Sequence, residues 1–253
     1  MKKFMKMFLV LFAILSFSAT ACKHDAGDGR EYGLRNFPGT LELSGQVWEL
    51  NYNTGKLSQI YIKFAGNRDV KAILELPYNY PAPPTVVQVG SGEILNGVLN
   101  LSISALDDQY LLHDGEDILW YIFQEWYTDD DNNGFPETSH ISINDPNAKG
   151  NIITLTTVPA GTLVLECFLG AYGELSSEYV HFIYVDRDCK ITADTVKLPG
   201  PRYTYNAFEI ELKAGWNTVH RTETYNTAGD SSYSVRLQNP LDLRWVLWPV
   251  SVL

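Results

Sequence analysis

The residues whose spacing is most typical of a binding site are the acids of one short loop. Asp129, Asp131 and Asn133 stand two positions apart, and a glycine follows them. Hard cations such as Ca²⁺ take several oxygen ligands, and calcium loops begin with this spacing. The twelfth position, where such loops carry a bidentate glutamate, holds His140, so Glu137 would have to supply the carboxylate. The sequence therefore leaves calcium open, with a solvated turn as the alternative.

Residue types that perform catalysis are present, but their spacing does not match a catalytic motif. No two of the five histidines have the spacing of a zinc site, and no G-x-S-x-G motif occurs. Glu209 and Glu211 alternate along one strand, which predicts that both face solvent. His181 alternates within an apolar strand and is expected to be a satisfied core or rim residue. We therefore expect a protein that is not an enzyme and needs no cofactor.

Aromatic side chains are the remaining candidates for ligand binding. The chain has 6 Trp, 15 Tyr and 11 Phe. Trp120, Trp126 and Tyr127 lie in residues 118–127. Residues 107–124 are the one segment that could be helical, but the crowding of Tyr, Ile, Trp and Phe after Asp117 leads us to expect a strand over 118–127 with aromatic side chains on both faces. Such a row suits sugar rings, whose C–H faces pack on aromatic rings, whereas packing within a β-protein is the alternative.

The elements that would position these residues are almost all strands. Asn96-Gly97 between two apolar runs predicts a type I′ hairpin turn. After it, Leu99, Leu101 and Ile103 are expected to point inward, as in an antiparallel sheet with one buried face. The other expected strands cover residues 41–50, 60–64, 70–76, 118–127, 141–143, 152–158, 162–169, 179–186, 203–212, 216–221, 233–237 and 243–250.

This spacing predicts an all-β fold, an antiparallel β-sandwich or barrel. Turn-forming residues at 145–150 suggest two lobes, 40–146 and 147–253. One continuous domain over 40–253 is the alternative, because β-domains reach this size.

Two cysteines, Cys167 and Cys189, could form a disulfide if strand register brings them together. A hairpin turn centred on residues 173–174 would pair Cys167 with about Val180 and keep the sulfur atoms apart. A turn centred on residues 177–178 would place the two cysteines opposite each other.

The N-terminus has the order of a secretory signal. Three lysines precede an apolar run over residues 7–15, small residues occupy 18–21, and Cys22 follows. This arrangement resembles the lipobox of bacterial lipoproteins, in which the cysteine is acylated and becomes the new N-terminus. Ordinary signal-peptidase cleavage after Ala21 is the alternative. Residues 1–21 are then a signal peptide, and residues 22–39 a tether.

The charge of the mature chain argues against polyanionic partners. The full chain has a net charge of −11, and removing residues 1–21 takes away three lysines and no acid, which leaves −14. Nucleic acids and anionic lipid headgroups attract clustered Lys and Arg, which the chain lacks. Membrane attachment would therefore come from acyl chains on Cys22.

Further resemblances point to the outer membrane of the cell envelope. No aspartate follows Cys22, and in many Gram-negative bacteria an aspartate there retains lipoproteins at the inner membrane. Residues 184–192 and 212–219 resemble uncharacterised β-rich lipoproteins of spirochaetes, and the charges after Cys22 are similar to tethers of Bacteroidetes-type lipoproteins. This resemblance implies an outer-membrane location and no known activity.

Three functions remain from the sequence. The first is a non-catalytic binding or adhesion module, with glycans as the candidate ligand. The second is a lipocalin-like carrier of a small apolar ligand, and the third is a hydrolase.

Overall fold

In the computed structural model of the chain, strands make up nearly all of the regular structure. The structure describes residues 39–51, 60–76, 85–112, 115–123, 127–128, 138–159, 161–171, 174–197, 203–226, 230–237 and 244–249. The strands are β1 (Leu41–Asn51), β2 (Ile60–Lys63), β3 (Arg68–Leu76), β4 (Thr85–Leu95), β5 (Val98–Ile103), β6 (Tyr127–Thr128), β7 (Thr138–Ser139), β8 (Ile141–Ile143), β9 (Gly150–Val158), β10 (Gly161–Ala171), β11 (Glu174–Val185), β12 (Cys189–Ala193), β13 (Val196–Lys197), β14 (Tyr203–Tyr205), β15 (Phe208–Leu212), β16 (Gly215–Asn226), β17 (Ser231–Arg236) and β18 (Arg244–Pro249). The helical segments are the 3₁₀ turn η1 (Asp108–Tyr110) and α2 (Gly115–Phe123).

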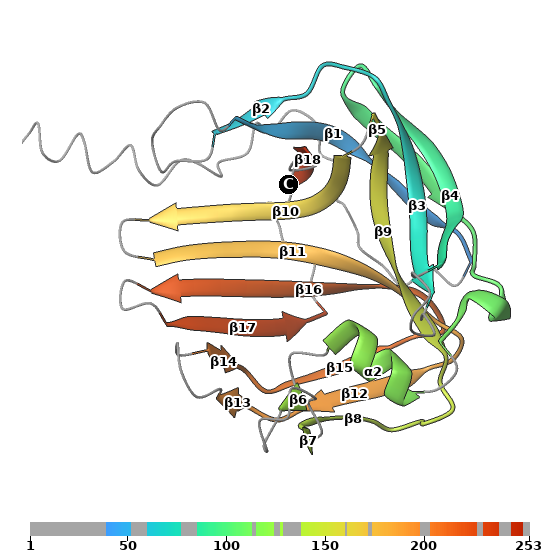
Figure 1. Ribbon diagram of the computed structural model, residues 1–253, viewed down its shortest axis with the longest axis vertical. Coiled ribbons are helices and arrows are strands. Elements are labelled where there is room, and N and C mark those ends of the chain that lie inside the picture. The colour runs from blue at the N-terminus through green and yellow to red at the C-terminus, as the bar shows by residue number, and fades with distance from the viewer. Residues whose placement is uncertain are drawn as a thin grey trace, which may run out of the picture.

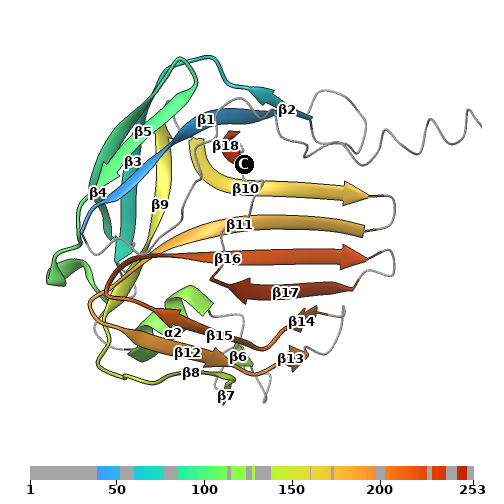
Figure 2. The same cartoon turned by 180° about the vertical axis from the view of Figure 1, so that it is seen from behind.

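Seven strands close into a barrel (Figures 1 and 2). Their order around the ring is β10, β18, β1, β5, β4, β3 and β9, and the ring closes where residues 161–163 of β10 pair with residues 155–157 of β9. The pairing of β1 with β18 is parallel, with Val47 opposite Trp245, and the other neighbours in the ring are antiparallel. The all-β prediction is confirmed, and the architecture is a barrel with additional strands.

A second part of the sheet leaves the barrel at β11. One edge of this strand pairs first with β10 and then with β9, whereas its other edge pairs with β16 over its whole length. The strands β17, β14 and β13 continue outward from β16. We call β11, β16, β17, β14 and β13 the extended sheet. A small sheet in the order β15-β12-β8 and the helix α2 lie beside it (Figure 1).

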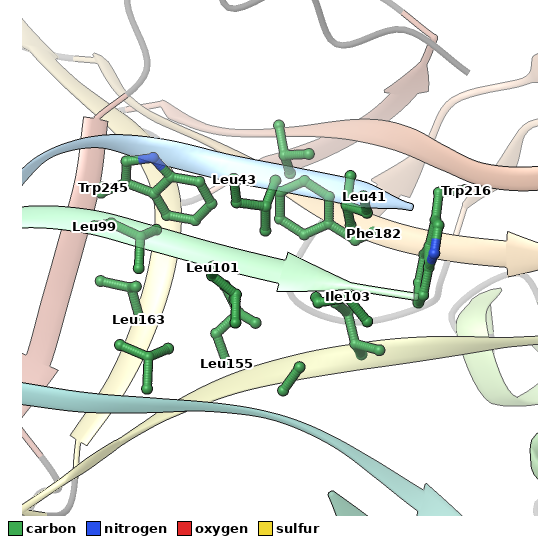
Figure 3. Packing of buried hydrophobic residues seen from close by; sticks show 14 of the residues in the cluster. Leu41, Leu43, Leu99, Leu101, Ile103, Leu155, Leu163, Phe182, Trp216 and Trp245 are labelled. Atoms are coloured by element: carbon green, nitrogen blue, oxygen red, sulfur yellow. The ribbon is translucent and has the colours of Figure 1, made fainter. Parts of the chain in front are cut away.

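The barrel core is built from alternate residues of its strands (Figure 3). Successive side chains of a strand point to opposite faces, so Leu99, Leu101 and Ile103 of β5 face inward together, as predicted. Leu41 and Leu43 of β1 lie opposite Ile103 and Leu101 in the register. Each of these five side chains is at most 5% exposed, and burying one contributes about 1.5–3 kcal/mol.

Aromatic residues from the extended sheet and from β18 complete this core. Phe182 of β11 stacks on Trp245 with ring centroids 6.0 Å apart. Trp216 of β16 is fully buried and donates its indole N–H to the carbonyl of Ser104 at 3.2 Å. The indole of Trp245 likewise donates to the carbonyl of Ser44 at 3.1 Å. The extended sheet therefore packs one face onto the barrel core.

The predicted hairpin turn is confirmed. Asn96 and Gly97 have φ of 50° and 80°, the positive values that a type I′ turn requires. A Cβ on Gly97 would lie 1.8 Å from the carbonyl oxygen of Phe64, so the close approach of this backbone also demands glycine. The carbonyl of Gly97 accepts a hydrogen bond from the backbone N–H of Val47, which fixes the hairpin against β1.

The strand expected at residues 118–127 is wrong for its first part, which is the helix α2. Its buried residues are Ile118, Leu119, Ile122 and Phe123, and this spacing places them on one helical face. The β-propensity of the aromatic residues was given too much weight, because the burial of one apolar face decides between helix and strand here. No helix within the described ranges has the length and apolar character needed to cross a membrane.

Two smaller differences concern the small sheet. Residues 203–212, expected as one strand, are divided at Asn206-Ala207 into β14, which belongs to the extended sheet, and β15, which belongs to the small sheet. The central strand of the small sheet, β12, was not among the expected strands. Its inward residues are Cys189, Ile191 and Ala193, so only one large apolar side chain marks this strand in the sequence.

The register of β10 and β11 keeps the two cysteines apart. Cys167 lies opposite Glu178, two residues from the expected partner Val180, and Ala171 lies opposite Glu174. This register agrees with the first of the two turn centres considered, and not with the second. Cys189 is a buried free thiol in β12, and burial raises its pKa to about 11.

Strands from both predicted lobes contribute to the barrel. β1, β3, β4 and β5 come from residues 40–146, and β9, β10 and β18 come from residues 147–253. The buried apolar residues form two clusters, one inside the barrel and one between the extended sheet, α2 and the small sheet. The division into domains at residue 146 stays a prediction.

Candidate ligand-binding face

A group of aromatic and charged side chains lies on the extended sheet, on the face turned away from the barrel core. Val180, Phe182 and Trp216 point to the barrel from β11 and β16, so the alternate residues of these strands point to the other side. The register places Tyr179 opposite Arg221, and Glu223 opposite Tyr233. We call this group the polar–aromatic face; its members are Tyr179, His181, Arg221, Glu223, Tyr225 and Tyr233.

Glu223 is the centre of this face. One of its carboxylate oxygens, Oε1, accepts hydrogen bonds from the hydroxyls of both Tyr225 and Tyr233. The other oxygen, Oε2, has no hydrogen bond to any described residue and is not among the buried atoms without a partner. The carboxylate is thus fixed in orientation by two phenols through Oε1, while no described residue forms a hydrogen bond to Oε2.

The two phenols are held in their protonated form. Burial, followed by the hydrogen bond and negative charge of Glu223, raises the pKa of Tyr225 to about 12. The same causes raise the pKa of Tyr233. Both hydroxyls therefore remain hydrogen-bond donors to Glu223 throughout the physiological range. Tyr225 is 37% exposed, so one side of its ring is available to a ligand.

The inner end of the face carries a positive charge and a neutral imidazole. The guanidinium of Arg221 lies over the ring of Tyr179, 5.7 Å from its centroid, and Arg221 is only 7% exposed. The ring of His181 meets the same tyrosine edge-on at 5.4 Å. Burial, together with the charge of Arg221, lowers the pKa of His181 to about 3. His181 is consequently uncharged at neutral pH.

His181 is not the satisfied residue that the sequence suggested. Its Nε2 atom is inaccessible to solvent and has no hydrogen-bond partner. A buried polar atom without a partner costs about 1–3 kcal/mol, and sites of this kind are often functional or strained. His181 does lie at the rim of the second apolar cluster. The next residue on the same face of β11 is Ile183, which belongs to that cluster.

Tyrosines of β14 extend the aromatic surface. Tyr205 stacks on Tyr233 with centroids 4.7 Å apart, and Tyr203 packs against the same ring at 6.3 Å. These positions follow from the parallel pairing of β14 with β17, in which Tyr205 lies opposite Tyr233. The aromatic surface therefore spans four adjacent strands, β11, β16, β17 and β14.

The aromatic residues chosen from the sequence are not placed on this face. Trp120 lies in α2 and Tyr127 in β6, but the side chains of both, and Trp126 as a whole, fall outside the described residues. Their role in ligand binding stays a prediction. Cys22 also lies outside the described residues.

The candidate calcium ligands belong to the segment that separates β6 from β7. Asp129, Asp131, Asn133 and Glu137 all fall outside the described residues, between the paired strands β6 and β7. Among the side chains that are described, no three of the His, Cys, Asp and Glu type come close enough to hold a metal ion. Calcium binding by this segment stays a prediction.

The carboxylates Glu209 and Glu211 face solvent as predicted. In β15 they alternate with the buried Phe208, Ile210 and Leu212. Glu209 pairs with Lys190 at 2.8 Å on the same exposed face. These contacts describe an ordinary solvated surface of a sheet.

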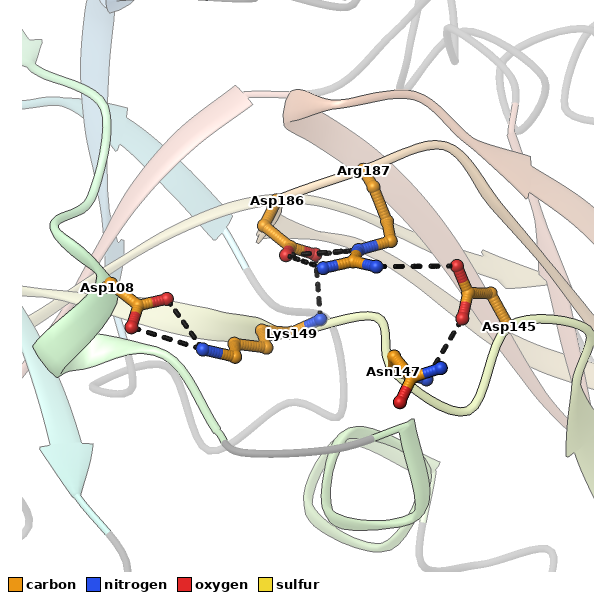
Figure 4. A network of polar contacts seen from close by, with 6 residues as sticks. All are labelled: Asp108, Asp145, Asn147, Lys149, Asp186 and Arg187. Carbon is orange, nitrogen blue, oxygen red and sulfur yellow. Dashed lines mark hydrogen bonds and ion pairs between the residues drawn. The ribbon is translucent and has the colours of Figure 1, made fainter.

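A separate group of ion pairs connects loops of the barrel with loops of the extended sheet and the small sheet (Figure 4). The ammonium group of Lys149 contacts Asp108 of η1 at 2.8 Å, while its backbone N–H donates to Asp186 at 2.8 Å. Asp186 also accepts from Arg187 at 2.9 Å, and Arg187 reaches Asp145 at 3.8 Å. We name these residues the ion-pair junction, and its contacts connect the loops at one end of β8, β9 and β11.

The polar–aromatic face was overlooked in the sequence although part of its signal was visible. Tyr179 and His181 alternate on one strand, and Arg221, Glu223 and Tyr225 alternate on another. What the sequence does not contain is the register that brings these two rows, and Tyr233 from a third strand, side by side.

No family model, curated protein or solved structure matches this chain. Function must therefore be argued from the geometry. The closed barrel is compatible with a binding or carrier module.

Proposed function

We propose that the protein is a lipid-anchored binding module of the bacterial outer membrane, and that the polar–aromatic face is its glycan-binding surface. The observation that supports this most is the carboxylate of Glu223, which two tyrosines orient through Oε1 while no described residue bonds to its Oε2. A ligand hydroxyl could donate to this oxygen without any rearrangement of the site. Preorganised groups of this kind lose little conformational entropy on binding.

The aromatic rings supply the second element of glycan recognition. Tyr225 is partly exposed and Tyr203 and Tyr233 are half-buried, so their rings offer apolar surface next to the carboxylate. The C–H face of a sugar packs on such rings while its hydroxyls reach the polar groups beside them. Small-molecule sites commonly combine apolar surface with a few placed polar groups in this way.

The exterior face is better supported than the barrel interior as the ligand site. A lipocalin-like carrier would hold its ligand inside the barrel. The inward positions instead carry large side chains, and Leu41, Leu99 and Ile103 are fully buried within the barrel cluster (Figure 3). Small barrels of this strand number are commonly filled by their own side chains.

The anchor rests on the N-terminal sequence. Cys22 would carry the acyl chains, each buried methylene of which contributes about 0.8 kcal/mol to membrane attachment. Mass spectrometry of the mature protein should find an acylated Cys22 at the N-terminus. An unmodified N-terminus at this position would contradict the anchor while leaving the glycan site untouched.

Glycan binding can be tested with the mature protein in detergent on a glycan array. We expect retention of a subset of glycans, and a loss of affinity of about fivefold for Tyr225→Ala, because stacking on an aromatic ring contributes on the order of 1 kcal/mol. Tyr225→Phe should lose less, since it keeps the ring and removes only the hydroxyl bonded to Glu223.

Glu211→Gln is the matched control for the carboxylate. It neutralises one exposed glutamate on the small sheet, outside the polar–aromatic face, and should leave retention unchanged. Retention of no glycan, or equal retention by Tyr225→Ala and the unmodified protein, would refute the proposed surface.

A further inference from the structure

The polar–aromatic face has a charge distribution that favours one class of glycan. Glu223 brings a negative charge to the outer end of the face, and both hydrogen bonds that it accepts come from neutral phenols. The phenols orient the carboxylate without neutralising it. Its charge is therefore available to a ligand that carries a positive group.

The rings around Glu223 favour the same kind of group. The faces of aromatic rings are electronegative and attract ammonium groups within about 6 Å. Tyr225 and Tyr233 both reach Oε1 of Glu223 with their hydroxyls, so the rings of both tyrosines extend outward from the carboxylate. Tyr203 adds a third ring, 6.3 Å from that of Tyr233.

The positive charge of the polar–aromatic face belongs to Arg221 and lies at the inner end of the face. The guanidinium of Arg221 lies over Tyr179 on β11, on the side away from β17, and is mostly buried. His181 adds no charge, because its pKa is lowered to about 3. A ligand that approaches Glu223 and Tyr225 therefore meets a carboxylate and aromatic rings first.

We propose that this site selects saccharides that carry a free amino group, with Glu223 pairing with the ammonium and Tyr225 and Tyr233 flanking it. This inference rests on the proposed glycan-binding function and names the class of glycan. The neutral, N-acetylated form of the same sugar lacks the ammonium group and loses the charge-assisted contact. The net charge of −14 of the mature chain adds long-range attraction for such ligands.

Isothermal titration with two matched oligosaccharides tests the selection. The probes are a glucosamine tetramer and an N-acetylglucosamine tetramer, titrated into the mature protein at about pH 6, where the amines are protonated. We expect the amino form to bind about tenfold more tightly, the size of one charge-assisted contact at a partly exposed site. Glu223→Gln should bring the two affinities together.

The control separates this site from the overall negative charge. Glu211→Gln removes one negative charge at a distance from the face and should keep the tenfold preference. Equal binding of both tetramers to the unmodified protein, or a preference that survives in Glu223→Gln, would overturn the selection for amino groups and leave glycan binding intact. Binding of neither tetramer, together with an empty glycan array, would overturn the proposed function itself.

Discussion

The barrel and the extended sheet are built from the same kind of strand, but they use their two faces differently. In β5 every second residue is buried and the residues between them are exposed, which is the pattern of a wall between core and solvent. In β16 the inner residues are buried on both faces, and the outer residues are only half-buried or exposed on both. Along β16, the extended sheet thus changes from a core element at its inner end to a partly exposed surface at its outer end.

Because of this difference, a binding surface costs less stability on the outer end of the extended sheet than inside the barrel. The barrel interior depends on close packing of large apolar groups, and any polar group there would lose its hydration. The outer end of the extended sheet is anchored by the apolar residues of its inner end. Polar side chains such as Glu223 and Tyr225 can therefore be held in fixed orientations there without contributing to the core.

The comparison predicts that the largest loss of stability comes from the shared core. Trp216→Ala removes a fully buried indole and its hydrogen bond to Ser104, and should lower the free energy of unfolding by about 3–5 kcal/mol. Tyr225→Ala at the outer end of the same strand should lower it by less than about 1 kcal/mol. Urea unfolding followed by far-UV circular dichroism measures the free energy of unfolding of both variants. Losses of similar size would contradict the distinction between the inner and outer ends of β16.

A smaller effect is expected from the buried imidazole at the boundary between core and platform. Since the pKa of His181 is lowered to about 3 from 6.5, the unfolded chain binds a proton below pH 6.5 and the folded chain does not. Stability should therefore fall as the pH decreases from 6.5 towards 3, by about 1.4 kcal/mol per pH unit at most.

His181→Phe should remove this contribution, so that its stability relative to the unmodified protein rises steadily as the pH falls. Unfolding curves at several values of pH between 4 and 7 measure the difference. A constant difference over this range would show that the pKa of His181 is the same in the folded and the unfolded chain, and would contradict its lowering by burial.

The smallest effect is expected at the ion-pair junction between the two regions. Burial alone would raise the pKa of Asp186, but hydrogen bonds and charges from Arg187 and Lys149 lower it overall. Its contribution to stability is therefore present above its ordinary pKa of 3.8 and is lost as the pH falls through the folded-state pKa. Asp186→Asn should cost about 1 kcal/mol at pH 7 and almost nothing in strong acid.

Asp194→Asn, at an exposed carboxylate between β12 and β13, is the matched control and should change stability little. A cost for Asp186→Asn that stays the same in acid would mean that its charge does not stabilise the junction.

Local features of the fold could be predicted because they depend on neighbouring residues. The turn at Asn96-Gly97 and the inward row Leu99, Leu101 and Ile103 need only backbone preferences and alternation. The helix α2 was missed because the aromatic content of residues 118–127 favoured a strand, while its one apolar face favoured a helix. That choice is made by what the segment packs against.

The candidate site could be predicted only in part, since it depends on contacts between distant strands. The rows Tyr179–His181 and Arg221–Tyr225 are visible as alternation, but their common face depends on the register of β11 with β16. The contribution of Tyr205 depends further on a parallel pairing between β14 and β17. Pairing over such separations leaves no signal in a single sequence.

The parallel pair of β1 and β18 also constrains when the protein can fold. β18 stands between β10 and β1 in the ring, and its Trp245 bonds to Ser44, 201 residues earlier in the chain. The ring can therefore close only when β18, the last strand of the barrel in the chain, has paired with β1, the first. Contacts between such distant residues slow folding, and a chain that emerges from its N-terminus cannot complete the barrel until β18 has also emerged. For an exported protein, this delay would keep the chain open until its passage across the membrane is finished.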